Sequence, residues 1–87
     1  MGRTLPSATQ LMHQEEAALA RFRRALRRDD QLVFDDLFTA AQKHISATAY
    51  AAHALPFETF LMAMLLEEHK EVMRLREIVA VLESMHA

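Results

Sequence analysis

Three ionisable residues occur on otherwise apolar helical faces of this 87-residue chain: Glu15, His44 and Glu68. Each belongs to a different stretch with helical periodicity, and a rise of about 1.5 Å per residue places all three near one level of an up-down-up bundle. Carboxylates and imidazole that converge inside a helical bundle are the ligands of di-iron carboxylate proteins, and imidazole also binds zinc. The spacing therefore raises two hypotheses, a buried polar layer and a metal site.

The residue pattern favours the polar layer. A carboxylate buried in an apolar core must find a partner or take up a proton, and His44 is an available partner for both glutamates. The di-iron bundles use Glu-x-x-His pairs, whereas Glu68 and His69 are adjacent and point in different directions on a helix. We therefore predict a structural role without a metal or other cofactor: a hydrogen-bonded Glu15–His44–Glu68 layer, or glutamates whose carboxylates reach water at the bundle surface. Metal binding by the same three residues is the alternative.

A second candidate site is the arginine-rich segment RFRRALRR at 21–28. A basic helix of this kind can bind nucleic-acid phosphates. The whole chain, however, has a formal charge of −2, with six arginines against two glutamates in 1–28 and eight acidic residues against two lysines in 29–71. We therefore expect a solvated face, or pairing with the aspartates at 29–36, and keep nucleic-acid regulation as an alternative function. The arginines concerned are Arg21, Arg23, Arg24, Arg27 and Arg28.

Composition argues against catalysis and against a membrane span. Gly2 is the only glycine, and phosphate-binding loops and nucleophile elbows depend on glycine. No nucleophile, base and orienting group occur together, so we expect no enzyme. The absence of cysteine excludes disulfides and thiolate metal sites and fits a reducing cytoplasm. The longest strongly apolar stretch, 60–66, is far shorter than the roughly 20 residues of a membrane helix.

The elements that must position these residues are three helices, expected at about 8–28, 30–52 and 56–85 after a frayed start at 1–7. Asp29 or Asp30 can cap the second helix. Pro56 suits the first position of the third, where the missing N–H is not needed. We predict an all-α fold, in which one domain forms a three-helix up-down-up bundle with a long C-terminal helix.

The third helix has a 4-3 spacing of apolar residues from Leu61 onward, interrupted by Glu68, which is typical of a coiled-coil-like seam. A chain of this size buries only about 60–65% of its unfolded surface, and apolar surface in excess of one core indicates an interface. We therefore predict a homodimeric helical bundle that acts as a protein-interaction module, with another protein as a further possible partner. The residues predicted for the interface are Phe60, Met62, Leu66, Met73, Leu75, Val79 and Leu82.

Overall fold

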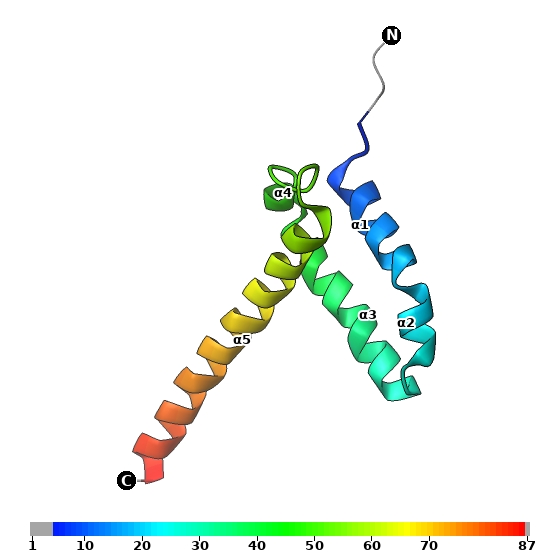
Figure 1. Ribbon diagram of the computed structural model, residues 1–87. Helices are drawn as coiled ribbons and strands as arrows, with labels where there is room; N and C mark the ends of the chain where they lie inside the picture. Colours follow the sequence, from blue (N-terminus) through cyan, green and yellow to red (C-terminus); the bar gives the residue numbers. More distant parts are fainter. Residues whose placement is uncertain (1–4, 87) are drawn as a thin grey trace.

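The computed structural model describes residues 5–86, and within that range the chain is helical with no strand (Figure 1). The prediction of an all-α fold is therefore confirmed. Short turns join five helices where three were expected. The helices are α1 (Ala8–Ala18), α2 (Ala20–Ala25), α3 (Arg28–Gln42), α4 (Ile45–Thr48) and α5 (Pro56–His86).

The first helix begins with a capping box and is interrupted after three turns. Ser7 Oγ accepts a hydrogen bond from the Gln10 backbone N–H at 3.1 Å, and the Gln10 side chain accepts one from the Ser7 N–H at 2.8 Å. These two bonds satisfy amide donors that a helix start leaves unpaired. Leu19 leaves helical geometry (φ −96°, ψ 10°) and separates α1 from α2. The helix expected to continue to 28 ends at Ala25, because the backbone at Leu26 is extended.

The second expected helix begins earlier and ends much earlier than 30–52. It starts at Arg28, so Asp29 and Asp30 lie in its first turn and do not cap it. Carboxylates there still favour the positive end of the helix dipole. The helix ends at Gln42, and after the one-turn α4 the chain reverses through 49–55. This reversal allows α5 to pack back against α1 and α3.

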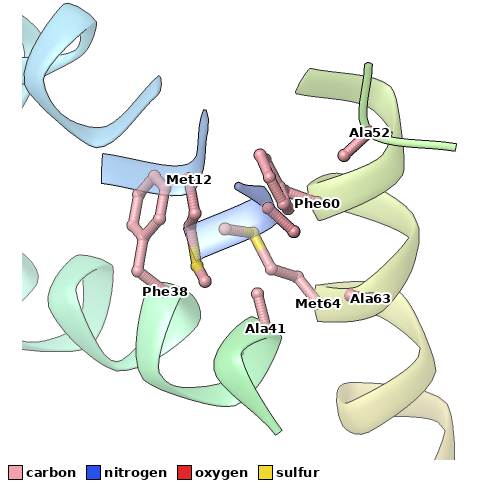
Figure 2. Packing of buried hydrophobic residues seen from close by; sticks show 8 residues of the cluster. Met12, Phe38, Ala41, Ala52, Phe60, Ala63 and Met64 are labelled. Carbon is pink, nitrogen blue, oxygen red and sulfur yellow. The ribbon is translucent and has the colours of Figure 1, made fainter. Parts of the chain in front are cut away.

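The core is small and draws on α1, α3, the 49–55 turn and the beginning of α5 (Figure 2). Phe60 is its largest fully buried side chain, at 1% exposure. Alanines at several positions allow the helix backbones to approach closely. The buried hydrophobic residues are Ala8, Met12, Phe38, Ala41, Ala52, Phe60, Ala63 and Met64.

Helix α5 leaves this core after its first three turns. The α1–α2 segment and α3 form an antiparallel hairpin, and α5 packs across one end of it and then diverges, so that it does not lie along the hairpin as in a closed three-helix bundle (Figure 1). Every residue from 68 to 86 is exposed. We call residues 5–67 the body and residues 68–86 the free half of α5. The radius of gyration is 17.0 Å, whereas a compact chain of this length has about 12 Å.

Candidate interaction surface on the C-terminal helix

The free half of α5 displays an apolar stripe that nothing in the body covers. Its members follow the 4-3 spacing, with a carboxylate at one end and an imidazole at the other. Its four apolar side chains are each 40–50% exposed. We call this stripe the C-terminal seam; it consists of Glu68, Val72, Leu75, Val79, Leu82 and His86.

The sequence of the free half favours a helix even though this segment is not packed against the body. No glycine or proline interrupts it, and most of its residues have high helix propensity. At its start, Arg74 donates two hydrogen bonds to Glu71, at 2.7 and 3.1 Å. Such a pair three residues apart stabilises an isolated helix by about 0.2–0.5 kcal/mol. Most helical stability in proteins comes from packing of an apolar face. The apolar face of the free half is exposed, so packing against the body does not stabilise this helix.

Apolar side chains also flank the C-terminal seam. An open groove of about 360 Å³ runs along one side, where Val72, Val79 and Ala80 form part of the lining. On another side, Ile78 and Val81 line a second groove. Contiguous exposed apolar surface of this kind is typical of protein–protein interaction sites.

The residues predicted for the interface lie in three places: the core, the exposed side of the first turns of α5, and the free half of α5. Phe60 is buried inside the chain itself, so its assignment to an interface is wrong: it lies on the side of α5 that faces α1 and the 49–55 turn (Figure 2). The others are exposed, the most open being Met62 at 64%. Those remaining candidates are Met62, Leu66, Met73, Leu75, Val79 and Leu82.

The polar cluster on α5 is centred one residue before the predicted one. His44 Nε2 lies 2.5 Å from Glu67 Oε1, and since a carboxylate only accepts hydrogen bonds, that nitrogen must carry a proton. Lys70 Nζ donates to the same oxygen at 2.9 Å. The hydrogen bonds from Lys70 and then His44 hold the pKa of the Glu67 carboxyl below its ordinary value of 4.5, against an opposing effect of desolvation.

The predicted Glu15–His44–Glu68 layer is therefore not what the structure shows. Glu68 is exposed, Glu15 is half-buried, and His44 contacts Glu67. A step of one residue rotates a side chain by about 100° on a helix, which separates Glu67 at the body from Glu68 on the C-terminal seam. The signal in the sequence was Glu67-x-x-Lys70, a spacing at which opposite charges meet.

The described part of the chain does not bring metal-binding side chains together. Within residues 5–86, no three His, Cys, Asp or Glu side chains are close enough to hold an ion. Glu83 and His86 do have the Glu-x-x-His spacing, but they lie at the exposed end of α5. Their carboxylate and imidazole groups are therefore open to solvent.

The arginine-rich segment is partly used inside the chain. Arg23 donates two hydrogen bonds to Asp35, at 2.7 and 2.8 Å, which joins α2 to α3. This bidentate pair raises the pKa of Arg23 and lowers the pKa of Asp35. The pairing with an aspartate across the hairpin that we expected from the sequence is therefore present at this one arginine. Four others are exposed: Arg21, Arg24, Arg27 and Arg28.

A second apolar site, which the sequence analysis did not single out, lies between the hairpin and the first turns of α5. It is a crevice of about 240 Å³ without polar lining. The rings of Phe22 and Phe34 are 5.6 Å apart, and those of Phe34 and Phe38 are 5.5 Å apart, distances typical of aromatic packing. Its lining residues are Leu19, Phe22, Phe34, Leu37, Phe38, Phe57, Leu61 and Met64.

Comparisons with known proteins add a family but no function. No helix within the described residues has the length and apolar character required to cross a membrane. Neither the curated proteins nor the solved structures contain a match to this chain. One family matches over residues 1–87. The chain therefore belongs to the family described as Domain of unknown function (DUF8156).

Proposed function

We propose that this protein is a small self-associating helical module, in which two copies pair through the C-terminal seam of α5. The observation that carries the proposal is the exposed 4-3 stripe on a helix that projects beyond its own core. A second copy presents the same stripe, and closed two-fold dimers are the commonest oligomers. We place the module in the cytoplasm, in keeping with the absence of cysteine.

The expected affinity follows from the surface available. Full burial of a Leu, Val, Ile or Met side chain contributes about 1.5–3 kcal/mol, so a half-exposed one contributes about 1 kcal/mol. If Ile78 and Met85 pack beside the four apolar seam residues, twelve side chains in two copies contribute about 12 kcal/mol. Association costs at least about 4 kcal/mol. The net value of about 8 kcal/mol corresponds to a dissociation constant in the micromolar range at the tightest.

The direct test is the mass of the protein in solution as a function of concentration. Light scattering or sedimentation equilibrium from about 1 to 100 µM covers the expected range of dissociation constants. We expect the mass to rise from one chain to two. A single-chain mass throughout would contradict the proposal.

A pair of matched lysine substitutions tests the surface itself. Leu75→Lys places a charge in the C-terminal seam, and we expect it to raise the dissociation constant at least roughly 100-fold, because an unpaired buried charge is costly. Glu77→Lys, two residues away on the other side of α5, should leave the dissociation constant within about threefold of the original value. Equal effects of the two variants would place the contact elsewhere on the chain.

A further inference from the structure

The C-terminal seam has chemically different ends. It begins with the carboxylate of Glu68 and ends with the imidazole of His86, with four apolar residues between them. The two ends are about 27 Å apart along the helix at about 1.5 Å per residue. Both ends are exposed, and the body lies beside only the first of them. A second copy can therefore meet like ends with like, or opposite ends with one another.

From this asymmetry we infer that the two copies pair antiparallel, with Glu68 of each copy opposite His86 of the second copy; the inference rests on the proposed function. In a two-fold contact, residue i meets residue j and j meets i. With the axis level with Glu77, the six seam positions then form closed layers. The layers are Glu68 with His86, Val72 with Leu82 and Leu75 with Val79, each occurring twice.

Charge at the seam distinguishes this arrangement from the parallel one. A parallel pair in register places Glu68 against Glu68, and two carboxylates at a partly desolvated contact repel each other. It also places His86 against His86, so that neither imidazole faces a carboxylate. The antiparallel pair replaces both contacts with a carboxylate beside an imidazole, which can donate to it. His69 and Glu83 also become neighbours at the edge of the contact, by the same two-fold relation.

Charged residues at the edges of the contact favour the parallel pair, but their effect is weaker than that of the seam layers. A parallel pair would place Glu71 near Arg76 of the second copy, whereas an antiparallel pair places the two Arg76 side chains near each other. Glu71 is already hydrogen-bonded to Arg74 of its own helix. Exposed pairs contribute little compared with charges inside a contact. The seam layers therefore decide the orientation.

The same residues fix the register. Displacing one helix by a heptad places Glu68 opposite Val79, so that a carboxylate enters an apolar layer without a partner, which is costly. The proposed register uses residues 68–86, the continuous stretch of α5 in which every residue is exposed. The two bodies then lie at opposite ends of the paired helices.

Disulfide trapping tests the orientation, because the chain contains no cysteine and each introduced thiol is unique. Val72→Cys and Leu82→Cys proteins are mixed in equal amounts in a glutathione redox buffer, and the disulfide-linked species are separated by mass. Cysteine behaves as a small apolar residue in a helix contact, and circular dichroism checks that both variants remain helical. Glu77→Cys on the opposite side of α5 is the control for random collision.

The three outcomes are distinct. We expect the mixed 72–82 disulfide in roughly tenfold excess over either symmetric disulfide, because only that pair is held at high effective concentration. Predominance of the two symmetric disulfides would overturn the antiparallel orientation while self-association stands. Disulfide at no more than the Glu77→Cys level would contradict the proposed function and the inference with it.

A charge exchange gives an independent check by equilibrium binding. Glu68→Lys alone should weaken self-association about tenfold, since it removes the carboxylate that accepts a hydrogen bond from His86 of the second copy. Combining it with His86→Glu restores opposite charges only in the antiparallel pair, and the dissociation constant should return to within about threefold of the original value. Further weakening in the double variant would overturn the orientation.

Discussion

Two parts of α5 have similar residues and opposite surroundings. Along one stripe of the helix, Phe60 and Met64 are buried in the body. The stripe continues at the same 4-3 spacing through Ile78, Val81 and Met85, which are all exposed. The difference teaches that the neighbours of a side chain, and not its type, decide its burial here. The free half has the residues of a core without the elements that would complete one.

Charged residues separate the two parts. Between Met64 and Ile78, the stripe is occupied by Glu67, Glu71 and Arg74. Glu67 pairs with Lys70 and His44, and Glu71 pairs with Arg74. These charged side chains therefore have partners at the point where α5 leaves the body. The apolar surface beyond this polar section is therefore distinct from the core, and its energetics should respond to a second chain and not to the body.

The largest difference should appear when one residue on each side is truncated. Phe60→Ala should lower the free energy of unfolding by about 3–5 kcal/mol, through lost burial and the cavity left behind. Met85→Ala, on the same stripe, should change it by less than about 0.5 kcal/mol in dilute monomer. Urea unfolding followed by circular dichroism measures both. Similar losses from both would show that the free half packs on the body.

A smaller effect, with a pH dependence, is expected at the polar section. Glu67→Gln removes the charge that Lys70 and His44 stabilise. Because the pKa of Glu67 is lowered on folding, its stabilising contribution is present above the ordinary value of 4.5 and disappears as pH falls through the lowered value. The unfolding midpoints of variant and parent should differ at neutral pH and converge in acid. A midpoint difference that persists at low pH would assign the effect to packing.

The smallest expected effect compares two bidentate pairs of similar geometry. Arg23→Lys weakens the link from α2 to Asp35, because lysine lacks the planar fork that matches a carboxylate. Arg74→Lys weakens only a pair within the free half. We expect a measurable fall in the thermal midpoint for the first and none for the second. A larger fall for Arg74→Lys would indicate that the free half contributes to the stability of the monomer.

The long helix is the part of the fold that local rules predict best. Pro56 is suited to a first helical position and α5 begins there, and no residue after it favours a break. The interruption at Leu19 and the early end at Gln42 have no such signal, since the residues around them have ordinary helix propensity. The chain reverses through 49–55, where Ala52 is fully buried in the core, and a tertiary contact of this kind leaves no signal in local helix propensity.

The sequence predicted which residues form the apolar stripe of α5, but it did not predict which polar side chains contact one another. The 4-3 pattern located the C-terminal seam, whereas the partner of His44 depended on a rotation of one residue. The break at Lys43 and His44 changes the direction in which His44 points, relative to the uninterrupted helix expected from the sequence. Phe60 was misplaced for a related reason, since an all-apolar turn gives no indication of which side faces the core.

The projection of α5 also affects how the molecule moves through solution. Its extents are 68 × 32 × 14 Å, and a radius of gyration of 17.0 Å is that of a compact protein of about 220 residues. One chain will therefore diffuse more slowly, and elute earlier in gel filtration, than a globular protein of the same mass. An apparent dimer in that experiment is compatible with a lone rod-like chain, whereas scattering intensity reports mass without regard to shape.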